Sequence, residues 1–162
     1  MLRRNKDETF EALSVTQLKA KAVRWLAARE HTRAELARKL KPYSDSPTDI
    51  ESVLDDLERE GWQSDDRFAQ SFQRVKAGKQ GNALIAQGLR QKGLAPEVVA
   101  QAMVQLKDTE LDRARAVWHK KFGKVGLATE PKERARQARF LAGRGFGAEV
   151  IRRVVGEGLG ED

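Results

Sequence analysis

The chain has 162 residues, of which 31 are basic and 24 are acidic, giving a net charge of +7, a pI near 9.9 and a mean hydropathy of −0.65. Because cysteine is absent, disulfides, a thiolate nucleophile and cysteine-ligated metal sites are excluded, and a reducing cytoplasm is the expected location. No apolar run is long enough to span a membrane, and the first residues lack the apolar core of a secretory signal.

The apolar residues predict an all-α fold. The chain contains 21 Ala and 16 Leu but only 3 Ile, 6 Thr and 1 Tyr, which is typical of helices and unfavourable for strands. Apolar side chains recur at three- and four-residue spacing along the whole chain. In chain order these stripes predict nine short helices, around residues 18–26, 36–40, 50–57, 68–75, 85–89, 99–106, 111–122, 135–141 and 151–155.

Polar and special residues mark the ends of these helices. Thr32 and Glu35 have the spacing of a capping box, and Ser46 precedes Pro47 as a capping hydroxyl before a first-turn proline. Three glycines follow apolar stripes and are expected in the left-handed conformation that ends a helix, namely Gly61, Gly93 and Gly145.

The chain repeats itself with a period of about fifty residues. A shift of 49 residues aligns Leu36 and Leu54 with Ile85 and Met103, and a further shift of 52 aligns Gly93 with Gly145. We therefore expect an elongated array of three tandem three-helix, helix-turn-helix-like repeats in a monomer. The predicted division is a flexible segment 1–13, repeats at 14–62, 63–107 and 108–158, and a tail at 159–162.

The positive excess lies in the second and third repeats. The first repeat is balanced, and its acidic side chains concentrate on its third helix, between Asp49 and Glu60. Such asymmetry suggests a charged partner, often a polyanion, although a solvated helix face would also account for these side chains. The candidate contact residues are Arg74, Lys76, Lys79, Arg90, Lys92, Lys120, Lys121, Lys132, Arg136, Arg139, Arg144, Arg152 and Arg153.

Catalytic, metal and cofactor sites have little support in the sequence. His31 and His119 are far apart and are expected at the surface, and Asp65-Asp66 is explained by the dipole of the helix that it opens. The Gly78–Gly81 segment lacks the phosphate-loop pattern. Most aromatic residues fall on apolar stripes, which disfavours sequence-specific reading of bases. We expect no enzyme activity and no cofactor.

Four stretches, in order, resemble the RecX family of bacterial RecA modulators. They are AVRWLAAREHTRAELARKL (22–40), LEREGWQSDDRFAQSF (57–72), GNALIAQGLRQKGL (81–94) and FLAGRGFGAEVIRRVV (140–155). Trp62 and Gly88 depart from the family pattern, which usually has an aliphatic residue and a glutamate there.

The resemblance implies a non-enzymatic regulator. Members of this family bind the RecA–DNA filament and inhibit RecA ATP hydrolysis, strand exchange and co-protease activity, in recombinational repair and the SOS response. The resemblance therefore implies RecA filaments as the partner, with weak non-specific binding to single- or double-stranded DNA.

Two other classes stay open. A helix-turn-helix transcriptional regulator would bind one DNA site tightly, usually as a dimer. A nuclease would need converging carboxylates, which the sequence does not show.

Overall fold

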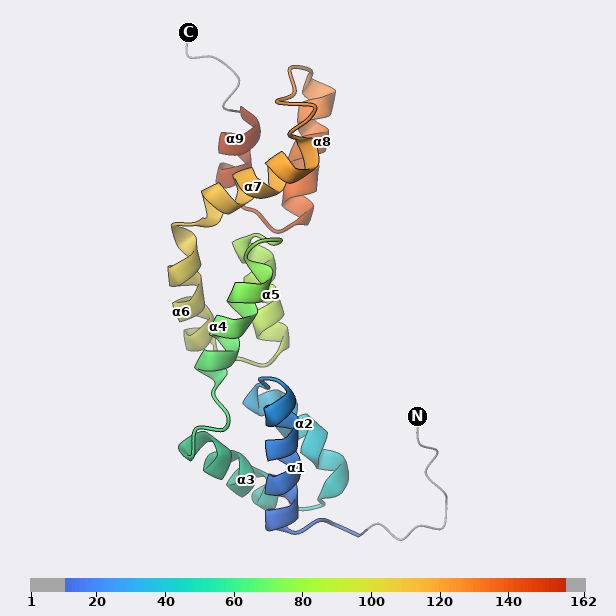
Figure 1. The fold of residues 1–162 in the computed structure, drawn as a ribbon, viewed down its shortest axis with the longest axis vertical. Helices are drawn as coiled ribbons and strands as arrows, with labels where there is room; N and C mark the ends of the chain where they lie inside the picture. The colour runs from blue at the N-terminus through green and yellow to red at the C-terminus, as the bar shows by residue number, and fades with distance from the viewer. Residues whose placement is uncertain (1–10, 157–162) are drawn as a thin grey trace, which may run out of the picture. The chain divides into compact units, whose positions relative to one another are not determined.

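The computed structural model describes residues 11–156, and all regular secondary structure in that range is helical, as predicted (Figure 1). The nine α-helices of this range are α1 (Val15–Ala28), α2 (Arg33–Leu40), α3 (Pro47–Arg59), α4 (Asp65–Lys76), α5 (Asn82–Gln91), α6 (Pro96–Lys107), α7 (Glu110–Phe122), α8 (Pro131–Gly143) and α9 (Ala148–Gly156). A short 3-10 helix, η1 (Lys41–Tyr43), follows α2.

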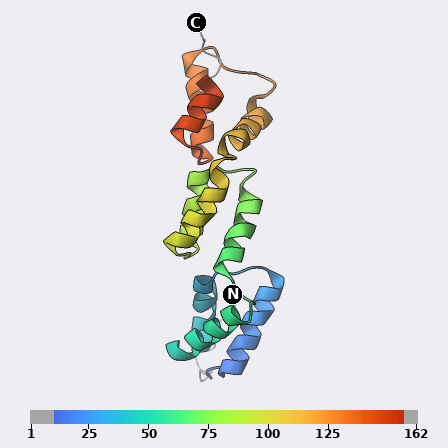
Figure 2. The same cartoon turned by 90° about the vertical axis from the view of Figure 1, so that its left-hand side faces the viewer.

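The helices group in threes. Helices α1–α3 form repeat 1, α4–α6 form repeat 2 and α7–α9 form repeat 3, and Figure 2 shows the same groups from another side. By contact the chain divides into two compact units, Met1–Asp65 and Asp66–Asp162, so repeats 2 and 3 share one unit. The repeat boundaries and the elongation stay predictions. The tail 159–162 and most of the segment 1–13 lie outside the described residues.

Side chains and prolines start the helices largely as the sequence predicts. Thr32 Oγ1 accepts from the Glu35 amide at 3.0 Å, and Ser46 Oγ accepts from the Asp49 amide at 3.2 Å. Sequence reasoning missed a complete capping box at Ser14 and Gln17, which opens α1. The three predicted helix-ending glycines have positive φ, at 79° for Gly61, 82° for Gly93 and 89° for Gly145.

Each repeat has its own apolar core. Repeat 1 buries Leu18 and Leu36 among others, repeat 2 buries Ile85 and Leu89, and repeat 3 buries Leu141. Two residues of the predicted apolar stripes are exposed, Ala135 of α8 and Val75 of α4, the latter at 64%. The inward face of α4 instead includes the buried residues Phe68, Ala69 and Gln73.

Gly88 has a packing reason. A Cβ at this position would lie 2.7 Å from Cζ of Phe72, closer than such contacts occur. Glycine inside a helix costs about 1 kcal/mol relative to alanine. Helix α5 bears this cost because a side chain at position 88 would occupy the space of the Phe72 ring of α4, which lies against α5.

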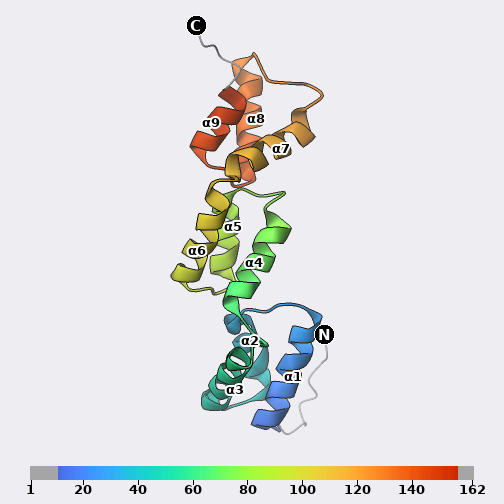
Figure 3. The same cartoon turned by 60° about the vertical axis from the view of Figure 1, so that its left-hand side comes forward.

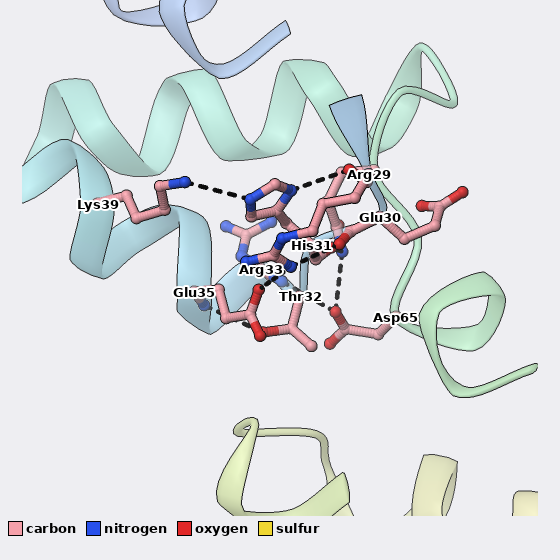
Figure 4. A network of polar contacts seen from close by, with 9 residues as sticks. Arg29, Glu30, His31, Thr32, Arg33, Glu35, Lys39 and Asp65 are labelled. Carbon is pink, nitrogen blue, oxygen red and sulfur yellow. Dashed lines mark hydrogen bonds and ion pairs between the residues drawn. The ribbon is translucent and has the colours of Figure 1, made fainter. Parts of the chain in front are cut away.

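His31 lies inside a polar network of repeat 1, where the sequence had predicted a surface histidine (Figure 4). His31 is 2% exposed. Its Nδ1 lies 3.0 Å from the Arg29 carbonyl oxygen and its Nε2 lies 3.3 Å from Lys39 Nζ. Both contacts are satisfied when Nδ1 carries a proton and Nε2 accepts from the lysine, which describes a neutral imidazole.

The same network holds the start of α2. The Asp65 carboxylate accepts from the Arg33 amide at 2.9 Å (Figure 4). It also accepts from Gln63 Nε2, at 2.8 Å. Gln63 is 2% exposed and also reaches the His31 carbonyl, at 3.4 Å. The residues between α3 and α4 therefore close over the N-terminus of α2.

Repeats 2 and 3 meet through their backbones. The Gly81 amide donates to the Arg144 carbonyl at 2.7 Å, and the Ala83 amide donates to the Gly145 carbonyl at 3.2 Å. A Cβ at Gly81 would collide with the backbone of Gly145 and Phe146. Glycine is therefore required at this contact because no side chain fits between the two chain segments.

The charged side chains of Arg113 and Glu110 add to this contact between repeats 2 and 3, which we call the joint. Arg113 of α7 donates to the carbonyls of Ala77 and Gln80, at 3.1 and 2.8 Å, and to the side chain of Asn82. Burial lowers the pKa of the Arg113 guanidinium, and the charge of Glu110 opposes this effect. Because Arg113 satisfies three acceptors around the loop that joins α4 to α5, it fixes that loop against repeat 3.

The joint predicts a strong effect of one methyl group. Gly81→Ala should destabilise the unit formed by repeats 2 and 3 by about 1–3 kcal/mol, because the new Cβ meets rigid backbone. Gly78→Ala is the matched control, since a Cβ there meets nothing within 4 Å in the same loop. Thermal melting followed by circular dichroism measures both, and equal melting temperatures for the two variants would contradict the joint.

The burial of His31 predicts that the free energy of unfolding depends on pH. Burial lowers the pKa of its imidazole below the ordinary value, and the positive charges of Arg29 and Lys39 act in the same direction, whereas Arg29's carbonyl and Glu35 oppose it. A base with a lowered folded-state pKa stabilises the fold fully above its unfolded pKa of about 6.5 and loses that contribution as pH falls through the folded pKa.

We therefore expect the free energy of unfolding, measured with urea, to fall between pH 7.5 and 5.5 by less in His31→Gln than in the wild type. His119→Gln, at an exposed position of α7, should keep the wild-type pH dependence. If His31→Gln keeps it as well, the buried ring is not the group that titrates.

Candidate partner-binding surface

The basic side chains concentrate on the second unit. Residues 66–156 carry 19 basic and 8 acidic side chains, whereas residues 11–65 carry 9 basic and 11 acidic ones. Repeats 2 and 3, which carry this excess, belong to one compact unit. The unit can therefore present a defined positive surface to a partner.

Part of the acidic helix of repeat 1 is paired within the repeat. The Arg33 guanidinium reaches Glu51, Asp55 and Glu58 of α3, at 2.6, 2.7 and 2.8 Å. Burial alone would lower the pKa of Arg33, but the hydrogen bonds to these carboxylates outweigh it and raise that pKa. This side of α3 is therefore part of an ion-pair network in which one guanidinium contacts three carboxylates, so a net negative charge remains on it.

In repeat 2 the structure separates the predicted basic residues into groups. Lys76 and Lys92 line one hollow between α4 and α5, which has a volume of about 390 Å³. Arg74 lies at a different hollow, beside Gln70 and Gln105. Lys79 and Arg90 are exposed, in the loop after α4 and near the end of α5.

In repeat 3 three basic side chains lie over aromatic rings. Lys121 and Arg144 both lie against Phe140, at 5.6 and 5.2 Å from the ring centre, and Arg136 lies 5.4 Å from the centre of Phe122. Lys120 and Lys132 are exposed. These contacts orient the charged groups without neutralising them.

Two of the predicted arginines already have carboxylate partners. Arg136 pairs with Glu133 at 2.7 Å, and Arg152 pairs with Glu149 at 2.6 Å. Hydrogen bonding to the arginine lowers the pKa of each glutamate and raises that of each arginine. Both pairs are exposed, so each contributes little to stability and can exchange for a partner's anion. Arg153 is exposed on α9, and Arg139 lines a groove between α8 and α9.

Sequence reasoning missed a cluster of cations and rings in repeat 1. Lys21 lies 4.3 Å from the ring centre of Tyr43, and Lys39 lies 4.5 Å from that of Trp25. The two rings are 6.4 Å apart. The four-residue spacing of Lys21 and Trp25 on α1 was the only available signal, because Lys39 and Tyr43 join the cluster through the tertiary fold.

Within residues 11–156, no group of three or more histidine, aspartate or glutamate side chains could hold a metal ion. None of the helices in this range has the length and apolar character needed to cross a membrane.

Family comparisons match all three repeats. Models described as the first, second and third three-helix domains of RecX match residues 19–57, 64–103 and 108–155. The matched ranges agree in order and number with the internal repeats of the sequence.

Curated relatives carry the same description. Regulatory protein RecX from Chromobacterium violaceum is 45% identical over 145 residues, covering 90% of this chain and 93% of its own. Regulatory protein RecX from Leptothrix cholodnii is 45% identical over 138 residues, covering 85% and 87%. Both relatives are named as regulatory proteins.

Solved structures support the fold. The crystal structure of RecX from Lactobacillus salivarius superposes with a TM-score of 0.79 at 17% identity, covering 88% of this chain and 95% of its own. A second crystal structure of regulatory protein RecX gives a TM-score of 0.73 at 21% identity, over 86% of this chain. From the three matched domains and the relatives at 45% identity, this chain belongs to the RecX family of regulatory proteins.

Proposed function

We propose that this protein regulates the RecA recombinase by binding the RecA–DNA filament through the basic surface of repeats 2 and 3. Binding there inhibits RecA ATP hydrolysis, strand exchange and co-protease activity, and the protein acts as a monomer in the cytoplasm without chemistry of its own. The observation that carries the proposal is the excess of 11 positive charges on residues 66–156. A nucleoprotein filament offers phosphates and acidic protein surface to such a unit.

The polar network of repeat 1 supports assigning attraction of the filament to repeats 2 and 3. Its acidic helix is engaged by Arg33, and its charge is nearly balanced. Steering toward a polyanion therefore comes from the second unit, because long-range attraction follows unpaired charge.

A charge-reversal series tests this surface. The triple variant Arg74→Glu, Lys79→Glu, Arg90→Glu changes exposed positions of repeat 2. The concentration that halves RecA ATPase on single-stranded DNA should rise about tenfold or more, because attraction to the filament becomes repulsion. The matched control is Arg24→Glu, Arg38→Glu, Lys41→Glu, which makes the same charge change at exposed positions of repeat 1 and should change it by less than about twofold.

Both triple variants should keep their helical signal, since surface changes usually cost within about 0.5 kcal/mol each. A folded repeat 2 variant that inhibits at the wild-type concentration would remove this surface from the proposal. Absence of inhibition by the wild type would overturn the function itself.

DNA binding alone should be weak and electrostatic. We expect the logarithm of the affinity for single- or double-stranded DNA to fall linearly with the logarithm of salt concentration, measured by fluorescence anisotropy. A tight, sequence-selective complex that tolerates salt would instead favour the helix-turn-helix transcriptional regulator.

A further inference from the structure

A groove between α8 and α9 combines an apolar floor with an arginine rim. The two helices lie side by side in repeat 3 (Figure 3), and the groove has a volume of about 670 Å³. Its floor is formed by Ala135, Ala138, Ala142, Ile151 and Val155. Its rim carries Arg134, Arg139 and Arg152.

The corresponding surface of repeat 2 is closed. The 52-residue register pairs Ala138 and Ile151 with Ala86 and Val99. Ala86 and Val99 are 5% and 3% exposed, in one core cluster with Phe68 of α4. Ala138 and Ile151 are half-buried at the open groove. Repeat 3 therefore leaves these two positions partly accessible, whereas the matching positions of repeat 2 are buried in its core.

Arginine N–H groups at the rim are available to donate hydrogen bonds to a partner's acceptors. Arg139 is exposed and forms no ion pair with another described residue. Arg134 donates from Nη2 to the Thr129 carbonyl at 3.2 Å, while its buried Nε has no acceptor among the described residues. The third arginine, Arg152, is held by Glu149 at the surface. Two guanidinium groups beside an apolar floor thus remain without a carboxylate.

We propose that this groove binds an acidic amphipathic segment of a partner protein. Aliphatic side chains of the segment pack between α8 and α9, where burial of apolar surface stabilises the complex, and its carboxylates accept from Arg139 and Arg134. This is the helix-in-groove mode of peptide recognition. A nucleic-acid backbone would match the arginines but would leave the aliphatic floor without a partner, and the floor offers no ring for base stacking.

The inference deepens the proposed function, because it assigns the α8–α9 groove to protein and leaves the exposed basic residues of repeat 2 for phosphate. Its test uses no RecA, so the two proposals can fail separately.

The probe is a fluorescent peptide of about twelve residues, three helical turns, with leucine at every third or fourth position and glutamate or aspartate elsewhere. A second peptide of equal charge has serine in place of leucine. Anisotropy titrations with the full chain should show the leucine peptide binding about tenfold more tightly than the serine peptide, since only the leucine peptide supplies apolar surface.

Variants of the groove separate its two features. Arg139→Glu removes a rim charge, and Ala142→Asp places a carboxylate beside the floor; each should weaken binding of the leucine peptide about tenfold. Lys107→Glu, at an exposed position of α6, is the matched control and should bind as the wild type does. Circular dichroism confirms that each variant is folded.

Three results would overturn the inference. Equal binding of the leucine and serine peptides would leave only non-specific charge attraction. A single-stranded oligonucleotide that displaces the peptide, and whose own binding falls equally in both groove variants, would assign the groove to nucleic acid. Tighter peptide binding by a chain shortened to end at Gly156 would identify residues 157–162, and not an external partner, as the occupant.

Discussion

The close approach of two backbone segments, at Gly81 and Gly145, is the constraint on which the second unit depends. It joins repeats 2 and 3 through amide–carbonyl hydrogen bonds that only a residue without a side chain permits at Gly81. Arg113 and Glu110 then satisfy the polar groups that this approach brings together, since Glu110 accepts from the Asn82 and Gly147 amides. The contact between the two repeats therefore consists of backbone hydrogen bonds and of the partly buried side chains of Arg113 and Glu110.

The joint between repeats 2 and 3 brings the basic residues of both repeats onto one unit. Basic residues on one compact unit add their fields toward the same partner, whereas residues on separate units need not. The first unit shows the opposite arrangement. Arg33 engages three carboxylates of α3 at once, so part of the acidic helix that stands out in the sequence is already paired within its own repeat.

Local departures from expectation have tertiary causes. Gly88 looks unfavourable within a helix, yet the Phe72 ring occupies the space that a side chain would need. His31 looks exposed between two charged or polar neighbours, yet Gln63 and Asp65 arrive from beyond α3 and enclose that junction. In both cases the deciding contact comes from a residue many positions away along the chain.

The sequence by itself determined the helices, most of their ends and the threefold repetition. These features follow from local rules: apolar spacing, capping hydroxyls such as Thr32 and Ser46, and the positive φ of Gly61, Gly93 and Gly145. The uneven distribution of charge could also be predicted, because it requires only counting the basic and acidic residues in each part of the sequence. Only the tertiary structure decided which charges on different helices form ion pairs, where repeats 2 and 3 contact each other, and which apolar surface stays exposed. Arg33 lies on α2, yet it pairs with Glu51, Asp55 and Glu58 of α3, and Arg139 lies at a groove between α8 and α9. Pairing, burial and exposure depend on distances between residues on different helices, and helical periodicity carries no information about those distances.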